Sequence, residues 1–180
     1  MILVTGGAGF IGSNFALDWL AQSNEAVVNL DNLTYAGNLQ NLASLKGNPG
    51  HIFAHGDIGN CKLVAELLLK YKPRAVLNFA AESHVDRSIH GPEDFIQTNI
   101  MGTFRLLEEV RAYWNQLEGD DKSNFRFLHV STDEDMAPWT KKNPLSPKPI
   151  GMNPIAPTQP ARQPVTSWYA LTTTPIACQF

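Results

Sequence analysis

The sequence is poor in the features that mark several classes of protein. Its two cysteines, Cys61 and Cys178, are too few for a disulfide framework and offer no paired spacing for zinc. No apolar run approaches the roughly 20 residues of a membrane span, and the start of the chain lacks the basic flank of a signal peptide. The 14 Lys and Arg are scattered and are outnumbered by 17 Asp and Glu, which argues against nucleic acid or an anionic membrane as a partner. We therefore expect a cytoplasmic protein with a small-molecule partner and no metal site.

Glycine and proline divide the chain into two parts. Residues 1–134 hold 12 of the 13 glycines and three of the 12 prolines, whereas residues 135–180 hold nine prolines and one glycine. Proline removes a backbone donor and interrupts both helices and strands. We expect one domain over 1–134 and an irregular tail over 135–180.

The first part alternates short apolar runs with stretches of helical periodicity, which is typical of a parallel α/β sheet. Helices are predicted between the first two strands and over Leu63–Tyr71 and Phe95–Trp114. Right-handed crossovers favour a doubly wound, Rossmann-like sheet in the strand order 3-2-1-4-5. The predicted strands are Ile2–Thr5, Ala26–Leu30, His51–His55, Ala75–Phe79 and Phe125–Val130.

Three glycines, Gly6, Gly9 and Gly12, lie between the first strand and the first helix. A tight turn, close approach to a pyrophosphate and close helix packing each require a missing side chain, and the helix N-terminus adds amides for an anion. The spacing differs from the commoner G-x-G-x-x-G. An ordinary tight turn is the alternative, but the flanking strand and helix favour dinucleotide binding.

Asp31 ends the second strand, about twenty residues beyond the glycines, where a carboxylate can accept both ribose hydroxyls. A 2′-phosphate would be repelled, so NAD is favoured over NADP. A turn-forming aspartate is the alternative. Asp57 and Ile58 follow the third strand and are candidates for the adenine edge, although a plain loop aspartate has the same spacing.

Two polar clusters follow the fourth and fifth strands, at the edge where open parallel sheets bind ligands. Ala80 to Ser88 reads Ala-Ala-Glu-Ser-His-Val-Asp-Arg-Ser, and Ser131 to Glu134 reads Ser-Thr-Asp-Glu. Two adjacent carboxylates with separated pKa values would form an acid/base pair, but a helix N-cap has the same sequence pattern. Asn99 could brace neighbouring loops or be a buried structural residue.

Together these segments resemble the extended short-chain dehydrogenase/reductases, and within them the dTDP-glucose 4,6-dehydratase family. The resemblance covers residues 1–134. The segments that carry it are Val4–Ser13, Asp31–Asn38, Ala80–Ile89, Thr98–Thr103 and Ser131–Glu134.

The resemblance implies an NAD-assisted dehydration of the nucleotide sugar dTDP-glucose, a lyase reaction, in an enzyme that is typically homodimeric. Thr132 would hydrogen-bond the C4 oxygen, Asp133 would protonate the leaving C6 hydroxyl and Glu134 would remove the C5 proton. Substrate contacts are implied for Ser83, His84, Asp86, Arg87 and Thr132. The implied cofactor contacts are Gly6, Gly9, Phe10, Ile11, Gly12, Asp31, Asn32, Thr34, Asp57, Ile58, Ala80, Ala81, Ser83 and Asn99.

The chain departs from the family in lacking the Tyr-x-x-x-Lys pair. The residues four places after its tyrosines are Leu39, Ala75, Leu117 and Thr173. We interpret the tail as family coding sequence read out of frame, because codons for 151–162, shifted by one base, permit Tyr-Glu-Pro-Asn-Ser-Pro-Tyr-Thr-Ala-Ser-Lys. The Rossmann-like domain would then be truncated and the chain inactive. A natural proline-rich linker is the alternative account of the tail.

Two other functions share the cofactor motifs. A nucleotide-sugar epimerase needs the glycines and Asp31 but not the acid/base pair at 133 and 134. A non-catalytic nucleotide-binding remnant needs only the cofactor site. Product analysis with dTDP-glucose would distinguish the three functions.

Overall fold

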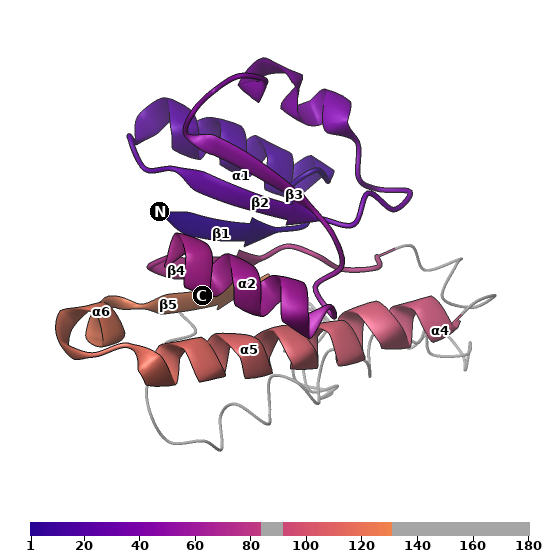
Figure 1. Ribbon diagram of the computed structural model, residues 1–180. Helices are drawn as coiled ribbons and strands as arrows, with labels where there is room; N and C mark the ends of the chain where they lie inside the picture. The colour runs from indigo at the N-terminus through magenta and orange to yellow at the C-terminus, as the bar shows by residue number, and fades with distance from the viewer. Residues whose placement is uncertain (84–91, 131–180) are drawn as a thin grey trace, which may run out of the picture.

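The computed structural model describes residues 1–83 and 92–130, which form a parallel five-stranded sheet with helices on both faces (Figure 1). The strand order β3-β2-β1-β4-β5 confirms the predicted order. Each strand begins and ends within one residue of its predicted bounds. The strands are β1 (Ile2–Thr5), β2 (Val27–Asp31), β3 (His51–His55), β4 (Ala75–Asn78) and β5 (Arg126–His129).

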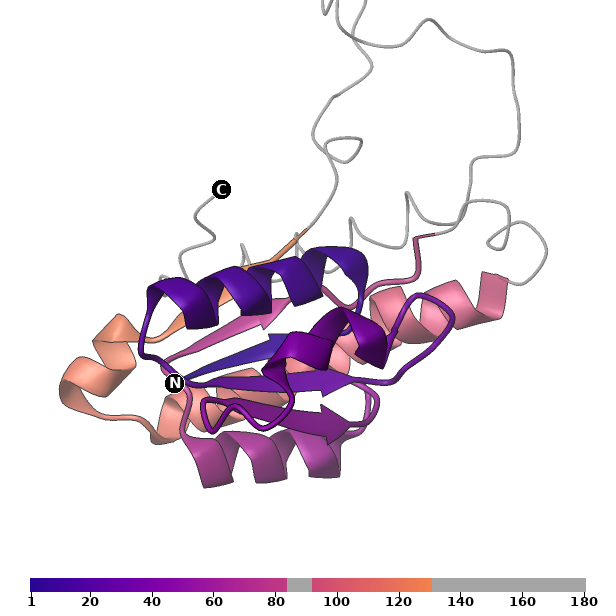
Figure 2. The same cartoon turned by 90° about the horizontal axis from the view of Figure 1, so that it is seen from above.

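Figure 2 shows the layers: α1 (Phe10–Gln22) and the 3-10 helix η1 (Leu39–Leu45) lie on one face of the sheet, and α2 (Cys61–Tyr71) and α5 (Thr103–Gln116) lie on the other. The predicted helix over Phe95–Trp114 is composite. It comprises α4 (Pro92–Phe95), a π-helical segment η2 (Ile96–Gly102) and α5. Sequence reasoning did not predict η1, the π-helical segment or the short α6 (Gly119–Asn124).

The core follows from the alternation of side chains along each strand. Leu3, Val28 and Val76 point toward α2 and α5 and pack in one buried cluster with Leu68 and Leu106. Their neighbours in sequence point the other way, and Ile2, Val4 and Val27 pack with Ala16 of α1. Both faces of the sheet are therefore buried, as expected for parallel strands joined by crossover helices.

The register aligns the carboxyl ends of the strands at one edge of the sheet. Thr5 at the end of β1 is level with Leu30 of β2 and with Asn78 of β4. The Thr5 hydroxyl donates to Asn78 Oδ1 over 2.5 Å, which ties the two strands together where the chain order reverses. In a doubly wound sheet this reversal is the point at which ligands bind.

Helix length and polarity also bear on membrane insertion. In the part of the chain that the structure describes, no helix is both long enough and apolar enough to span a membrane.

Candidate functional site

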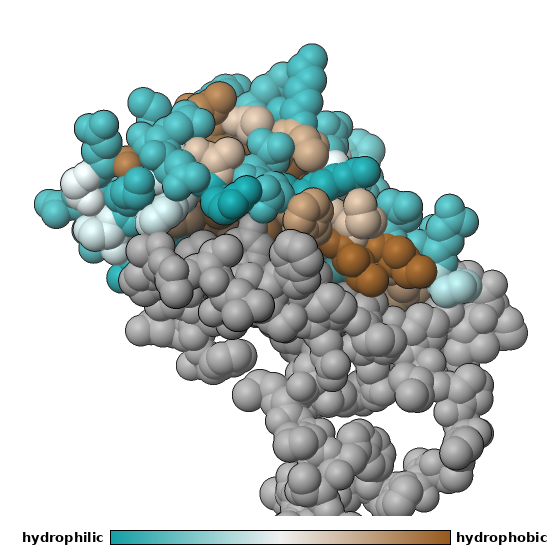
Figure 3. Space-filling model, turned by 90° about the horizontal axis from the view of Figure 1, so that it is seen from below, coloured by the Kyte–Doolittle hydropathy of each residue, from teal (hydrophilic) through white to brown (hydrophobic). Residues whose placement is uncertain are grey.

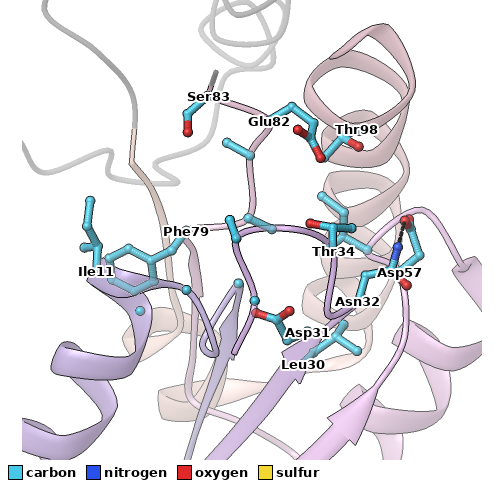
Figure 4. A pocket seen from close by; sticks show the side chains of 18 of the residues that line it. Ile11, Leu30, Asp31, Asn32, Thr34, Asp57, Phe79, Glu82, Ser83 and Thr98 are labelled. Carbon is cyan, nitrogen blue, oxygen red and sulfur yellow. Dashed lines mark hydrogen bonds between the residues drawn. The ribbon is translucent and has the colours of Figure 1, made fainter. Parts of the chain in front are cut away.

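A cavity of about 340 Å³ opens at the carboxyl edge of the sheet, over β1, β2 and β4 (Figure 4). Its walls come from four loops that follow strands, from the start of α1 and from Thr98 of η2. The lining residues are Gly6, Gly9, Phe10, Ile11, Gly12, Leu30, Asp31, Asn32, Thr34, Ala36, Gly37, Gly56, Asp57, Ile58, Phe79, Ala80, Ala81, Glu82, Ser83 and Thr98.

Two glycines are required by the tight path of the turn between β1 and α1. Gly6 has a φ of +68°, and a Cβ there would lie 2.6 Å from the backbone nitrogen of Ala80. A Cβ on Gly12 would lie 2.3 Å from the Gly6 carbonyl oxygen. The turn therefore passes directly against the end of β4, and α1 begins directly against the turn. Gly9 is less confined, because a Cβ there would meet only the Gly6 oxygen at 3.3 Å and the Ala36 oxygen at 3.9 Å.

Asp31 is buried and both of its carboxylate oxygens are held by backbone amides. Oδ2 accepts from Ala8 N and Oδ1 accepts from Leu33 N, each over 2.8 Å. Leu33 adopts a φ of +52°, and a Cβ on Gly37 would lie 2.6 Å from Asp31 Oδ1. Each carboxylate oxygen has a second lone pair, so Asp31 retains acceptor capacity toward the cavity that it lines.

Asn32 and Asp57 form a hydrogen-bonded polar pair in the wall of the cavity. Asn32 Nδ2 donates to Asp57 Oδ2 over 3.0 Å, as Figure 4 shows, and Asp57 Oδ1 accepts from Gly59 N over 2.6 Å. Asp57 thus organises its own loop as well as lining the cavity.

The loop after β4 is braced from the π-helical segment. Glu82 N donates to Asn99 Oδ1 and Asn99 Nδ2 donates to the Glu82 carbonyl, both over 2.8 Å and both buried. Asn99 is buried, does not line the cavity and hydrogen-bonds the loop, so it fits both alternatives, a brace and a buried structural residue. Figure 4 shows the side chains of Glu82 and Thr98 pointing toward each other at the cavity wall.

The structure brings thirteen of the fourteen predicted cofactor residues to this one cavity, all except Asn99. Six residues assigned to substrate binding or catalysis lie outside the described residues: His84, Asp86, Arg87, Thr132, Asp133 and Glu134. The proline-rich tail lies outside them too. In 1–83 and 92–130, no group of three or more His, Cys, Asp or Glu could hold a metal ion.

Seven lining residues were not predicted: Leu30, Ala36, Gly37, Gly56, Phe79, Glu82 and Thr98. Glu82 and Thr98 stand inside motifs that were singled out, so their position was a usable signal. The contact of Gly37 with Asp31 follows from the path of the loop after β2, which the sequence pattern does not specify.

The model of the GDP-mannose 4,6 dehydratase family matches residues 3–147. The chain belongs to this family. Among curated members, the dTDP-glucose 4,6-dehydratase of Xanthomonas campestris pv. campestris (strain B100) is 58% identical over 151 residues, which is 81% of this chain and 43% of that protein. An Escherichia coli dTDP-glucose 4,6-dehydratase is 52% identical over 133 residues, which is 74% of this chain and 37% of that protein.

The solved structures with this fold include both a dehydratase and an epimerase. The dTDP-glucose 4,6-dehydratase from Streptomyces venezuelae, solved with NAD and TYD bound, gives a TM-score of 0.73 at 38% identity and covers 95% of this chain and 52% of that one. A UDP-glucose 4-epimerase from Thermotoga maritima gives 0.72 at 29% identity and covers 94% of this chain and 50% of that one. The chain thus spans under half the length of these curated relatives and about half that of these solved structures.

Proposed function

We propose that this chain is the NAD-binding part of a dTDP-glucose 4,6-dehydratase. The observation that carries the proposal is that the turn between β1 and α1, residues 6–9 (the glycine turn), and the Asp31 carboxylate meet at one cavity. This cavity lies where the strand order of the sheet reverses. Relatives named for this activity are 50–58% identical to the chain, and one solved member carries NAD.

The described residues fit a dinucleotide. A Cβ on Gly6 or Gly12 would collide with the backbone of Ala80 or of Gly6, so the missing side chains permit a tight turn whose backbone can approach a pyrophosphate, and α1 starts beside it. The Asp31 carboxylate would accept hydrogen bonds from the hydroxyls of the adenosine ribose, and the Asn32–Asp57 pair would face the adenine. When bound, NAD would supply a hydride acceptor for sugar C4 and a hydride donor for C6.

The chain's own residues would carry the two proton transfers of the elimination, whereas the family passes the proton of the C4 hydroxyl to the tyrosine of Tyr-x-x-x-Lys, which this chain lacks. We assign removal of the C5 proton to Glu134 and protonation of the departing C6 hydroxyl to Asp133, so that the sugar loses one water. Thr132 would hydrogen-bond the C4 oxygen, and Ser83, His84, Asp86 and Arg87 would contact the nucleotide sugar. This requires one carboxyl to be protonated and its neighbour ionised.

Cofactor choice tests the proposal most directly. Asp31 would repel a 2′-phosphate, so we expect isothermal titration to give tighter binding of NAD than of NADP. Asp31→Ala should narrow the difference between the two cofactors. A wild-type chain that binds NADP as tightly as NAD would contradict the assignment.

Turnover of the 180-residue chain should be very low, because the family uses the tyrosine of Tyr-x-x-x-Lys as the general base for the C4 hydroxyl and this chain lacks the pair. Loss of a general base typically lowers the rate by about 10²- to 10⁴-fold. Inserting one base after codon 134, in a gene extended to the length of the relatives, should restore formation of the 4-keto-6-deoxy product. Full activity of the purified 180-residue chain would refute this reasoning. An inactive restored protein would argue instead for the non-catalytic remnant, and a C4 epimer as product would argue for the epimerase that the Thermotoga likeness supports.

We propose that the full protein is cytoplasmic and forms homodimers. Figure 3, which shows the molecule from below, has a mostly hydrophilic described surface with hydrophobic side chains in more than one place. Ile96 of η2 and Phe104 of α5 are each more than two-fifths exposed, as a subunit contact would require. Light scattering of the restored protein would give its mass, and a monomer at micromolar concentration would contradict the dimer.

A further inference from the structure

The carbonyl groups of the glycine turn are all engaged by donors, and two of these donors are asparagine side chains. Asn29 Nδ2, from β2, donates to Gly7 O over 3.1 Å. Asn41 Nδ2, from η1, donates to Ala8 O over 2.9 Å, and this oxygen also accepts from Asn38 N over 3.0 Å. The Gly6 carbonyl accepts from Gly9 N over 3.2 Å.

The direction of these carbonyls matters for an anionic ligand. A phosphate is attracted by backbone amides and repelled by backbone carbonyl oxygens. The first amides of any α-helix have no carbonyl partner inside the helix, and Phe10 and Ile11, at this position of α1, line the cavity. Donors that fix Gly7 O and Ala8 O therefore favour a turn that presents amides, rather than carbonyls, to the pyrophosphate.

Asn29 is suited to this task by its position. It is fully buried, and its Oδ1 has no hydrogen-bond partner among the described residues. A Cβ on Gly7 would lie 1.7 Å from that oxygen, so the turn packs directly on the side chain. Exchanging the amide oxygen and nitrogen would set Oδ1 against Gly7 O, so the donor orientation is the favourable one.

His51, at the start of β3, lies beside the same Asn29 nitrogen. The two nitrogens Asn29 Nδ2 and His51 Nε2 are 3.4 Å apart, and burial lowers the pKa of His51. A neutral imidazole nitrogen can accept the second amide hydrogen of Asn29. This contact would further fix the plane of the Asn29 amide.

We propose that Asn29 and Asn41 are positioning residues of the dinucleotide site, which hold the carbonyls of Gly7 and Ala8 away from the bound pyrophosphate. The inference rests on the proposed NAD binding and adds residues that act through the turn rather than by touching the cofactor. Neither asparagine lines the cavity.

The test uses the whole chain and three ligands: NAD, ADP-ribose and adenosine. Asn41 is exposed, so Asn41→Ala should fold, and we expect its dissociation constants for NAD and ADP-ribose to rise about two- to fivefold, the lower part of what one hydrogen bond contributes. Asn29→Asp removes the side-chain donor to Gly7 O and should raise these dissociation constants about tenfold. Adenosine has no pyrophosphate, and its affinity should change less than twofold.

A matched control is Asn48→Ala. Asn48 is also exposed, and its Oδ1 accepts from Gly50 N over 2.8 Å, outside the cavity. We expect unchanged binding of all three ligands. Asn41→Asp separates donation from space-filling: it preserves the size of the side chain but offers Ala8 O no donor, so it should bind NAD no better than Asn41→Ala.

Three results would overturn the inference. One is unchanged NAD affinity in Asn41→Ala, and another is full affinity in Asn41→Asp, which would leave only a space-filling role. The third is a loss of adenosine affinity equal to the loss of NAD affinity, which would show that the substitution disrupts the whole site. If Asn29→Asp fails to fold, the Asn41 variants still decide. A wild-type chain that binds none of the ligands would instead refute the proposed function, and the inference with it.

Discussion

Replacing Gly6 by alanine should destabilise the protein strongly, and the structure supplies a control that separates the two causes. Gly6 and Gly47 both have positive φ, +68° and +82°. A Cβ on Gly6 would lie 2.6 to 2.8 Å from three backbone atoms of Phe79 and Ala80, whereas a Cβ on Gly47 would meet nothing within 4 Å. Gly47→Ala therefore isolates the conformational effect, and Gly6→Ala adds the clash.

The magnitudes follow from these two environments. A left-handed conformation costs a non-glycine residue about 1–2 kcal/mol, and the reduced entropy of the unfolded chain offsets about 0.4–1 kcal/mol of that cost. We therefore expect Gly47→Ala to lower the free energy of unfolding by about 1 kcal/mol. Overpacking against well-packed atoms destabilises the folded state by about 1–3 kcal/mol more, and backbone atoms cannot rotate away. We therefore expect Gly6→Ala to lower the free energy of unfolding by about 2–4 kcal/mol.

Urea unfolding followed by circular dichroism measures both changes. With a slope of about 1–3 kcal/mol per molar urea, the Gly6→Ala midpoint should fall clearly below that of Gly47→Ala while the slope stays constant. Equal losses in the two variants would refute the reasoning, because they would show that the turn does not press on the end of β4. Gly119→Ala, at φ +52° and also in open space, should repeat the Gly47 result.

Three further outcomes are expected from other contacts. The Arg74 guanidinium, which donates twice to Glu25 over 2.7 Å, holds the pKa of Glu25 below its usual value, so the ion pair should stabilise the protein above about pH 4.5 and lose its effect as the pH falls through the lowered pKa. Since Arg74 is about half exposed, Glu25→Gln should lower the free energy of unfolding by only about 0.5–1 kcal/mol at pH 7, and the pH dependence of this free energy, measured by urea unfolding, should become weaker across that range. Burial lowers the pKa of His51, so the free energy of unfolding should decline as the pH falls below 6.5, because the unfolded chain then gains a proton that the folded chain does not. His51→Gln should remove this decline in the same unfolding assay. Asn99→Ala leaves the amide and the carbonyl of Glu82 buried without their partner and should lose about 1–3 kcal/mol, with faster hydrogen exchange at 81–83 than in wild type; unchanged exchange there would contradict the bracing role.

The sequence predicted the sheet well because its signals are local. Apolar runs such as Ile2–Val4, buried on both faces, are typical of a parallel sheet, and crossover handedness then restricts the strand order. The glycine turn and Asp31 were predictable because their spacing reflects one turn and one strand. Asn29 was not, since a lone polar residue in a strand gains meaning only when the turn of Gly7 packs on it. The π-helical segment was also missed, because helical periodicity does not distinguish one wide turn inside a long helix.

The pairing of Asp31 with the amides of Ala8 and Leu33 has a consequence for redesign of cofactor preference. The carboxylate that would discriminate between cofactors is also a structural partner of the turn, so a substitution that admits a 2′-phosphate leaves two amides without acceptors. A single change at position 31 would therefore weaken binding of both cofactors while altering their ratio. A productive switch to NADP would need a second substitution that supplies acceptors for Ala8 N and Leu33 N, and an evolutionary route through the single variant would pass through a protein with a loosened site.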